Sequence, residues 1–404
     1  MKNLSSYIQT LRHPVVARLT LIQFISYFGM WFSQVAIASM MVAYGASEME
    51  IASLFMMISL PAILLAPLTG YIIDRFPFKT LMQTLLIIEM SMTLLFMTID
   101  SLEDIPWLML FLFIRSMASS ILFSAEMALF PKILEGEMLK NTNEIHSVVW
   151  SVCFALGMAM GGMVTYHFGY DTTFIIDVIL YLTASMILLG LKLSLKPSIP
   201  QSAMKMMQSG FNYLRKHHKL IHLILLHAVV ALTSFDTIVT LLADHYYQQI
   251  IAVPLVIGWI NTTRAIGLSM GPLIFGHWIN QSTLHYALLL QGLSIILWSF
   301  VQKDYYLSLS AIFFVGLFST TIWSYTYYLL QQEINPSYLG RVIAYNDMIF
   351  MGTSILVTLF VGYCAKAGIA LQQISMILGI GFILMAGYYV WLKKRYFTQS
   401  SKAI

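Results

Sequence analysis

Long apolar stretches follow one another along almost the whole chain, separated by short polar segments. Each has about 18 residues or more, which as a helix is enough to cross the ~30 Å hydrocarbon core of a bilayer. The pattern therefore predicts twelve membrane-spanning helices. They cover residues 15–43, 49–73, 80–98, 105–128, 146–167 and 172–193, and then 219–243, 253–276, 284–301, 305–330, 343–365 and 371–391.

The longest polar interruption divides these spans into six plus six. It predicts an N-terminal six-helix bundle over residues 1–193, a cytoplasmic linker over 194–218 and a C-terminal six-helix bundle over 219–404. We thus expect an all-α integral membrane protein built from two six-helix pseudo-repeats.

Composition supports this class. Hydrophobic residues make up 59% of the chain and charged residues 10%, and the mean hydropathy is +0.78, values that exclude a soluble fold. The two cysteines, Cys153 and Cys364, lie inside apolar stretches, so neither a disulfide framework nor a metal site is expected. No cofactor and no nucleic-acid partner is predicted.

Basic residues indicate the orientation. If both termini are cytoplasmic, most of the 22 Lys and Arg residues fall on the cytoplasmic side, as positive residues do in membrane proteins. Lys303 and Lys366 fall outside, and Arg115 and Arg264 lie within spans.

A charged turn between the second and third spans reads Gly70-Tyr-Ile-Ile-Asp74-Arg75-Phe-Pro-Phe-Lys79. It resembles the G-x-x-x-D-R-x-G-R-[RK] loop of the major facilitator superfamily, with Pro77 and Phe78 at the places of Gly and Arg. We expect Gly70 to let two helices approach closely and Asp74 to accept hydrogen bonds from a neighbouring helix N-terminus.

A weak repeat of this turn follows the second span of the second half, from Gly276 to Asn280. The resemblance to the superfamily implies a twelve-helix fold with a substrate site near the bilayer midplane between the halves. Glycines in the fifth and eighth spans are expected to allow close helix packing. They are Gly157, Gly161 and Gly162, and Gly258, Gly267, Gly271 and Gly276.

Further stretches resemble the branch that contains macrolide efflux pumps and the enterobactin exporter, a drug:proton antiporter type. They are Gln23-x-x-Ser26-x-x-Gly29, Pro131 to Asn143, Phe174 to Val178, the amphipathic stretch Gly210 to His217, and Gln332 to Val342. The substrate is not encoded in any of these motifs.

Ionisable side chains at bilayer depth are candidates for transport, because each costs at least ~2.5–3.5 kcal/mol unless it has a partner, water or a function. Glu89 and Arg115 both lie roughly 14 Å deep, so we expect them to face one another as an ion pair. Either the pair is a static bridge, or Glu89 releases a proton when substrate competes for Arg115. Arg115 followed by Ser119 also resembles a helix-four motif of proton-coupled drug exporters.

Asp236, late in the seventh span, is a second candidate for carrying a proton or attracting a cationic substrate, and a structural cap is the alternative. Arg264 reaches it only if helix tilt closes a depth gap of roughly 10 Å. Asp177 is expected to be structural, and Asp347 to form an inner-gate salt bridge with Arg341. We expect that gate, together with the turn residues, to close the cytoplasmic side; the turn residues are Gly70, Asp74, Arg75 and Lys79.

Aromatic and amide residues supply candidates for the wall of a substrate cavity. Trp323 lies too deep to belong only to an interfacial belt. The other candidates for the cavity are Gln23, Tyr27, Trp31 and Gln34 of the first span, with Arg115 and Arg264.

These features predict a monomeric, proton-driven exporter of amphipathic small molecules such as drugs, macrolides or siderophores, in a bacterial inner membrane. Its partners would be substrate, protons and the lipid bilayer. An uptake permease for an organic acid or siderophore is an alternative if both Arg115 and Arg264 bind carboxylates. A lipid transporter is another, recognised by a lateral opening lined by polar residues. No catalytic dyad or nucleotide-binding loop is present, so an enzyme is not expected.

Overall fold

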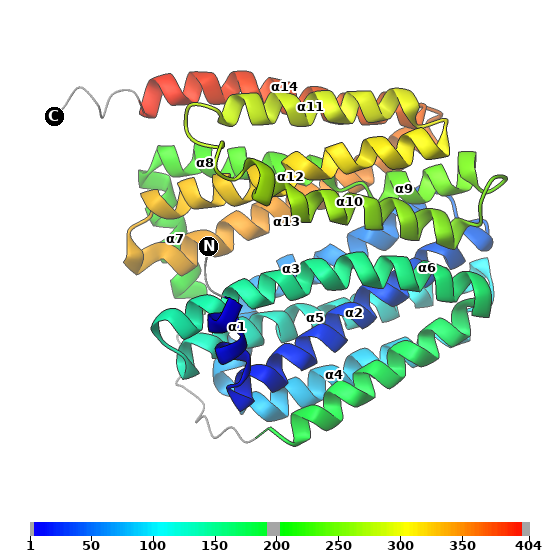
Figure 1. Cartoon of the computed structure of the whole chain (residues 1–404), viewed down its shortest axis with the longest axis horizontal. Coiled ribbons are helices and arrows are strands. Elements are labelled where there is room, and N and C mark those ends of the chain that lie inside the picture. Colours follow the sequence, from blue (N-terminus) through cyan, green and yellow to red (C-terminus); the bar gives the residue numbers. More distant parts are fainter. Residues whose placement is uncertain (1–3, 192–202, 398–404) are drawn as a thin grey trace. The chain divides into compact units, whose positions relative to one another are not determined.

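The computed structural model describes residues 4–191 and 203–397, and the elements in these ranges are helices (Figure 1). The predicted linker lies partly outside the described residues; the part inside includes a helix, α7. The α-helices are α1 (Leu4–Leu11), α2 (Pro14–Ala43), α3 (Glu48–Arg75), α4 (Phe78–Leu95), α5 (Ile105–Ile133), α6 (Gly136–Leu189), α7 (Ala203–Lys216), α8 (His218–Ala228), α9 (Asp236–Leu242), α10 (Val253–Phe275), α11 (Leu284–Val301), α12 (Tyr305–Glu333), α13 (Leu339–Lys366) and α14 (Leu371–Tyr396). Shorter turns are η1 (Phe96–Thr98), η2 (Leu102–Asp104), η3 (Val229–Thr233), η4 (Ala243–Tyr247) and η5 (Pro336–Tyr338).

Ten helical stretches in the described part of the chain are long and apolar enough to cross a membrane. One of them, α6, has 54 residues, about 80 Å of helix, which is far more than one crossing needs. It bends at Gly169, whose φ of 84° favours glycine, so the two predicted spans 146–167 and 172–193 lie on either side of the bend. The predicted span 253–276 corresponds to α10, a 23-residue helix that is not among the ten.

Local signals begin the helices where they are observed. Pro14 occupies the first turn of α2, where its missing N–H costs nothing. The backbone N–H and hydroxyl of Ser47 both donate to Glu50 Oε2 at 2.7 Å, which caps the start of α3. Asp304 accepts from the N–H of Leu307 and begins α12 in the same manner.

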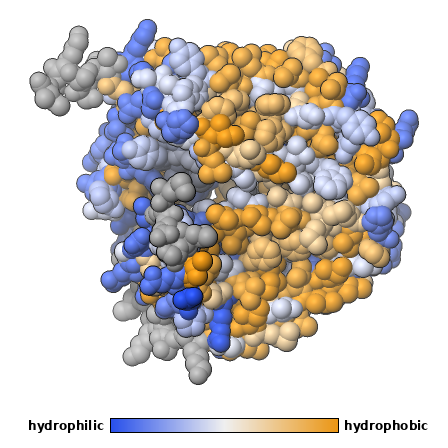
Figure 2. Space-filling model, in the orientation of Figure 1, coloured by the Kyte–Doolittle hydropathy of each residue, from blue (hydrophilic) through white to orange (hydrophobic). Residues whose placement is uncertain are grey.

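Two compact units make up the chain. Unit 1 comprises Met1–Ala46, Leu64–Ala203 and Ala252–Trp259, and unit 2 comprises Ser47–Ile63, Met204–Ile251 and Ile260–Ile404. The boundaries predicted at residues 193 and 219 stay a prediction. Figure 2 shows hydrophobic residues gathered along the helices and hydrophilic residues at many of their ends, the distribution that a lipid environment requires.

In unit 1, α2 packs along α6 at very short range. A methyl group on Gly161 would collide with the Phe32 carbonyl, and one on Gly157 would lie 2.7 Å from Trp31 Cβ. Gly162 meets Gly258 in the same way. The prediction of close helix contacts is confirmed for Gly157, Gly161, Gly162 and Gly258, because a larger residue would push the backbones apart, whereas a Cβ on Gly276 would meet only Pro272 of its own turn.

The core of unit 1 is apolar and is drawn from four helices, α2, α4, α5 and the second part of α6. Leu19, Leu86, Leu122 and Leu188 are representative, and all are buried. The short helix α1 docks on the start of α6, where Tyr7 donates to Glu144 at 2.5 Å and Asn141 donates to Ser6 at 2.7 Å.

In unit 2, α11 and α14 run side by side and meet at Gly292 and Gly379. The predicted seventh span, residues 219–243, is interrupted here. It runs as α8 and η3, leaves helical geometry at Ser234, and resumes as α9 at Asp236. Interruptions of this kind line binding sites in many transporters.

Candidate functional site

Arg115 is the centre of a buried polar cluster in unit 1. Its side chain projects from α5 and is 4% exposed. The Nη2 atom donates to Ser33 Oγ of α2 at 2.8 Å, to Asp177 Oδ2 at 3.0 Å and to Tyr181 Oη at 3.1 Å, the last two from the second part of α6. A buried guanidinium is stable only when its donors are satisfied in this way.

Asp177, and not Glu89, is therefore the ion-pair partner of Arg115, so the predicted Glu89–Arg115 pair is wrong. Space for the Asp177 carboxylate exists because Gly29 of α2 lies directly against it, where any side chain would collide with Asp177 Oδ1. This explains the glycine of the Gln23-x-x-Ser26-x-x-Gly29 motif as a requirement of the ion pair.

Glu89 of α4 is nevertheless part of the same cluster. It is 1% exposed and lies close enough to Arg115 and Tyr181 to interact electrostatically with both. Its Oε1 atom has no hydrogen-bond partner among the described residues. Tyr181 thus connects Glu89 to the Arg115–Asp177 pair.

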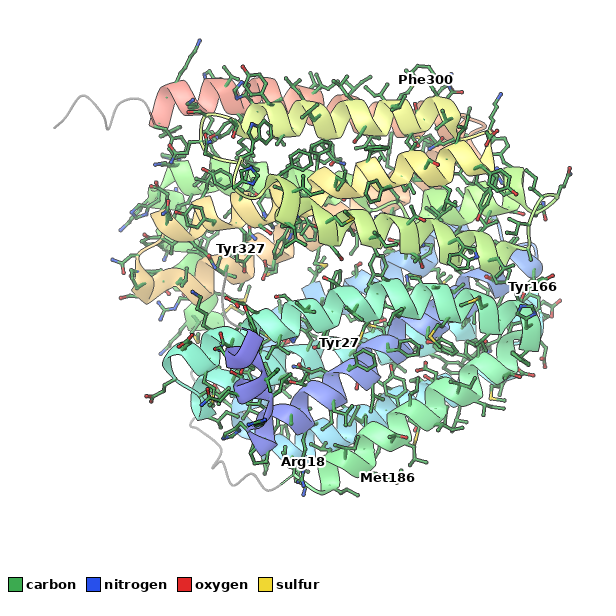
Figure 3. The ribbon with its side chains drawn as sticks, in the orientation of Figure 1. Arg18, Tyr27, Tyr166, Met186, Phe300 and Tyr327 are labelled. Carbon is green, nitrogen blue, oxygen red and sulfur yellow. The ribbon has the colours of Figure 1, made fainter. Side chains whose placement is uncertain are left out.

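Glu126 of α5 was missed by sequence reasoning. It is fully buried, and its Oε2 atom accepts a hydrogen bond of 2.8 Å from Tyr27 Oη of α2. Tyr27, labelled in Figure 3, in turn packs edge-on against the His146 ring of α6, with centroids 5.8 Å apart. The predicted span ended at residue 128, which placed Glu126 at its edge, whereas α5 continues to Ile133.

The other first-span candidates are placed as follows. Gln23 is buried beside Glu126, and neither amide atom has a hydrogen-bond partner in the described chain. Trp31 packs on Trp150 and Phe154 of α6, with ring centroids 5.8 and 4.6 Å away. Gln34 is 8% exposed.

The signature turn, from Gly70 to Lys79, has partners of its own in unit 1. Asp74 pairs with Lys132, at the end of α5, at 3.3 Å, and Arg75 donates to the Tyr71 hydroxyl at 2.5 Å. Lys79 donates to the carbonyls of Leu189 and Leu191 at 2.6 and 3.2 Å, so it caps the end of α6.

The role expected for Gly70 is wrong. A Cβ at this position would meet nothing within 4 Å among the described atoms, so no helix approaches closely there.

Asp236 and Arg264 form an ion pair in unit 2, with 3.9 Å between Oδ1 and Nη1. The guanidinium also lies over the Phe235 ring, 5.7 Å from its centroid, and donates to Asn261 Oδ1 at 3.5 Å. The 10 Å gap expected between them assumed a continuous helix. The break at Ser234 changes the path of the chain directly before Asp236.

Aromatic rings gather around His227 in the same unit. His227 Nδ1 lies 2.9 Å from Thr326 Oγ1, and its ring packs on Trp323, Tyr327 and Phe350 at 5.3 to 5.5 Å. Trp323 and Tyr327 are stacked with centroids 5.1 Å apart, and Trp323 keeps 38% of its surface exposed. Such a pair can hold a flat or cationic ligand by stacking.

The predicted Arg341–Asp347 bridge does not occur in the described structure. Arg341 donates to Ser209 of α7 at 2.8 Å and lies over the Tyr338 ring, whereas Asp347 accepts from Asn346 at 3.1 Å. The amphipathic helix α7, which was predicted to be part of the linker, docks on this end of α13. Its Ser209 is therefore close enough to bind Arg341.

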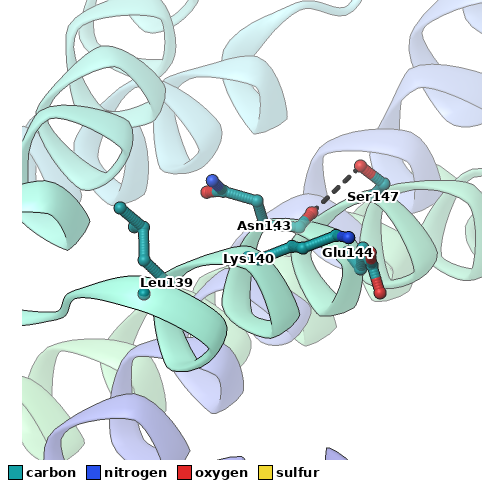
Figure 4. A pocket seen from close by; sticks show the side chains of 6 residues that line it. Leu139, Lys140, Asn143, Glu144 and Ser147 are labelled. Atoms are coloured by element: carbon teal, nitrogen blue, oxygen red, sulfur yellow. Dashed lines mark hydrogen bonds between the residues drawn. The ribbon is translucent and has the colours of Figure 1, made fainter. Parts of the chain in front are cut away.

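A pocket of about 430 Å³ lies on the first turns of α6, apart from these clusters (Figure 4). It is lined by Gly136, Leu139, Lys140, Asn143, Glu144 and Ser147. Among the described residues, no group of three or more His, Cys, Asp or Glu side chains could hold a metal ion.

Long apolar helices with buried charged clusters, as in the part of the chain that the structure describes, are typical of membrane transporters. The profile of the Major Facilitator Superfamily matches residues 19–250, and the chain belongs to this superfamily. A curated relative, the uncharacterised MFS-type transporter YkuC of Bacillus subtilis (strain 168), is 25% identical over 149 residues, which cover 37% of this chain and 34% of the relative.

Solved structures show the same fold. The nucleoside transporter NupG is similar with a TM-score of 0.75 and 13% identity, over 94% of this chain and 99% of NupG. A bacterial homologue of the human lysosomal transporter Spinster, in an inward-facing and unoccupied conformation, has a TM-score of 0.71 and 13% identity, over 95% and 97% of the two chains. At these identities the likeness concerns the fold alone.

Proposed function

We propose that this chain is a proton-driven secondary transporter that exports amphipathic small molecules by alternating access. The observation that carries the proposal is the buried cluster of unit 1. Glu89 and Asp177 lie around the buried cation Arg115, and Glu126 is buried farther along α5 without a cationic partner among the described residues. A buried carboxylate without a cation is costly, so a group of this kind is suited to binding and releasing protons.

The arginines favour export of neutral or cationic molecules over uptake of organic acids. Arg115 is engaged by Asp177, and Arg264 lies next to Asp236. A carboxylate substrate would have to displace a carboxylate of the protein at either site. The stacked pair Trp323 and Tyr327 instead supports a ligand with a flat or apolar surface.

The rest of the cycle follows from this proposal. Protonation of unit 1 carboxyls favours release to the outside, and deprotonation toward the cytoplasm resets the transporter. The Asp74–Arg75 turn stabilises the state closed to the cytoplasm. We place the protein as a monomer in a bacterial inner membrane, with both termini in the cytoplasm.

The test uses inverted membrane vesicles with a preformed proton gradient reported by a fluorescent dye. Ethidium, erythromycin, a nucleoside and a siderophore extract are added in turn to vesicles with wild-type protein, Glu89→Gln, or the exposed control Glu103→Gln. We expect a substrate-dependent loss of the gradient in the wild type and the control, reduced at least roughly tenfold in Glu89→Gln, as when ~1.4 kcal/mol of coupling is lost.

A wild type that responds to none of the compounds, at protein levels verified by immunoblot, would argue against proton-driven export. Uptake or lipid transport would then be favoured. A response of Glu89→Gln equal to that of the wild type would return Glu89 to a structural role.

A further inference from the structure

Glu126 lies in a part of unit 1 that is separate from the Arg115–Asp177 pair. Arg115 lies ten residues from the start of α5, and Glu126 lies seven residues from its end. At 1.5 Å per residue, the two positions are about 16 Å apart along the helix. Asp177 lies eight residues beyond the bend at Gly169, near the Arg115 level. Glu126 lies about 10 Å from the C-terminal end of α5, away from that level.

No cation pairs with Glu126 in the described structure. Its Oε1 atom has no hydrogen-bond partner there, while Oε2 accepts from Tyr27. An ionised carboxylate in this position would be buried without a counter-charge, which is far more costly than a protonated one. The absence of a counter-charge among the described residues therefore favours a protonated, neutral Glu126 in this conformation.

The surroundings also provide for the ionised form. The titratable groups around Glu126 are Tyr27 of α2, which donates to it, Glu89 of α4, whose charge acts on it, and His146 of α6, which packs on Tyr27. His146 packs on Phe123 and Phe130, which flank Glu126 on the same face of α5.

An amide group without partners adjoins the carboxyl. Neither amide atom of Gln23 has a hydrogen-bond partner in the described chain. Together with the Tyr27 hydroxyl, the Gln23 amide supplies donors that a carboxylate could use. A site that accommodates both the neutral and the charged form of a group is what reversible protonation requires.

We infer that the Glu126 carboxyl, hydrogen-bonded by Tyr27, is a second proton-binding site of unit 1. The O–H bond forms at the unpartnered Oε1, and on release the proton leaves a carboxylate that Tyr27 and Gln23 stabilise. This inference rests on the proposed proton-driven transport.

The first experiment needs no substrate. Infrared difference spectra of purified wild type, Glu126→Gln, Tyr27→Phe and the control Glu103→Gln are recorded between acid and alkaline pH. We expect a carboxylic acid C=O band that is lost in Glu126→Gln, shifted in Tyr27→Phe and unchanged in the control. A spectrum of Glu126→Gln identical to that of the wild type would overturn the inference. If that variant fails to fold, an unshifted band in Tyr27→Phe would do the same.

The second experiment separates the inference from the proposed function. Ethidium transport by reconstituted protein is measured with an imposed pH gradient and, separately, as exchange at equal pH. We expect Glu126→Gln to lose gradient-driven transport at least roughly tenfold while exchange stays within about twofold, since only the coupling step is removed. Gradient-driven transport of Glu126→Gln at the wild-type rate would overturn the inference alone. A wild type indifferent to the gradient would instead overturn proton-driven export, and with it the coupling role of Glu126.

Discussion

Replacing Gly29 by alanine tests the architecture of the unit 1 cluster with one methyl group. The new Cβ would collide with Asp177 Oδ1 and lie 3.4 Å from its Cγ. Asp177 would have to turn away from Arg115, and the 3.0 Å ion pair would break. Breaking a buried pair costs ~3–5 kcal/mol, and the better helix propensity of alanine returns ~1 kcal/mol.

The expected net loss is ~2–4 kcal/mol, toward the lower end because Arg115 keeps its hydrogen bonds to Ser33 and Tyr181. For a folded unit of about 150–250 residues this lowers the midpoint of thermal unfolding by about 5–15 °C. The assay is heating of detergent-purified protein followed by size-exclusion chromatography of the soluble fraction. Gly70→Ala is the matched control, because nothing lies within 4 Å of its new Cβ among the described atoms.

A double variant identifies the mechanism. If Gly29→Ala acts through Asp177, then adding it to Asp177→Asn should change the unfolding midpoint far less than it does alone, because the pair is already weakened. Additive losses in the double variant, or a Gly29→Ala protein as stable as the wild type, would refute the reasoning.

Two further predictions concern ion pairs elsewhere. Asp74→Asn removes an exposed pair with Lys132 worth ~0–1 kcal/mol, so the unfolding midpoint should stay within about 2 °C of the wild type, while vesicle transport slows roughly tenfold; full transport activity would exclude a role for the turn in closing the cytoplasmic side. Asp236→Asn leaves the half-buried Arg264 without its carboxylate and should cost ~1.5–3 kcal/mol of stability, measured by the same heating assay. Arg264→Gln added to it should recover most of the loss, and no recovery would mean that the 3.9 Å pair contributes little.

Much of the fold could be predicted from the sequence. Hydropathy is averaged over a window of about 19 residues, and the thickness of the bilayer fixes the length of a helix that crosses it. The two spans on either side of Gly169 were predicted correctly as separate, although α6 is one continuous helix by its hydrogen bonds and bends at this glycine. The interruption at Ser234 was not predicted, since neither Gly nor Pro marks it and a window average does not register two residues of irregular backbone.

The site was predicted less well, for a geometric reason. Counting residues gives the depth of a side chain, but not the direction in which it points around its helix. The similar depth predicted for Glu89 and Arg115 agrees with their lying in one cluster. The ion-pair partner of Arg115, however, is Asp177, which belongs to a helix later in the chain. Which carboxylate pairs with Arg115 is decided only by tertiary packing, including the space that Gly29 leaves for Asp177.

Glu126 illustrates the other limit. A carboxylate near the predicted end of a span is expected to reach the headgroup region. Five further residues of helix, up to Ile133, are enough to bury it instead.

The cap on the end of α6 bears on how this protein is made. The carbonyls there are bound by Lys79, from the turn after α3, and by Arg18, which donates to Gly190 from the start of α2. Both cations are synthesised more than a hundred residues before their acceptors. When the last N-terminal span leaves the ribosome, its end meets partners already in place, and the bond to Arg18 joins the first span to the sixth. These contacts between α2, α4 and the end of α6 can thus form before the residues that follow Leu191 are translated.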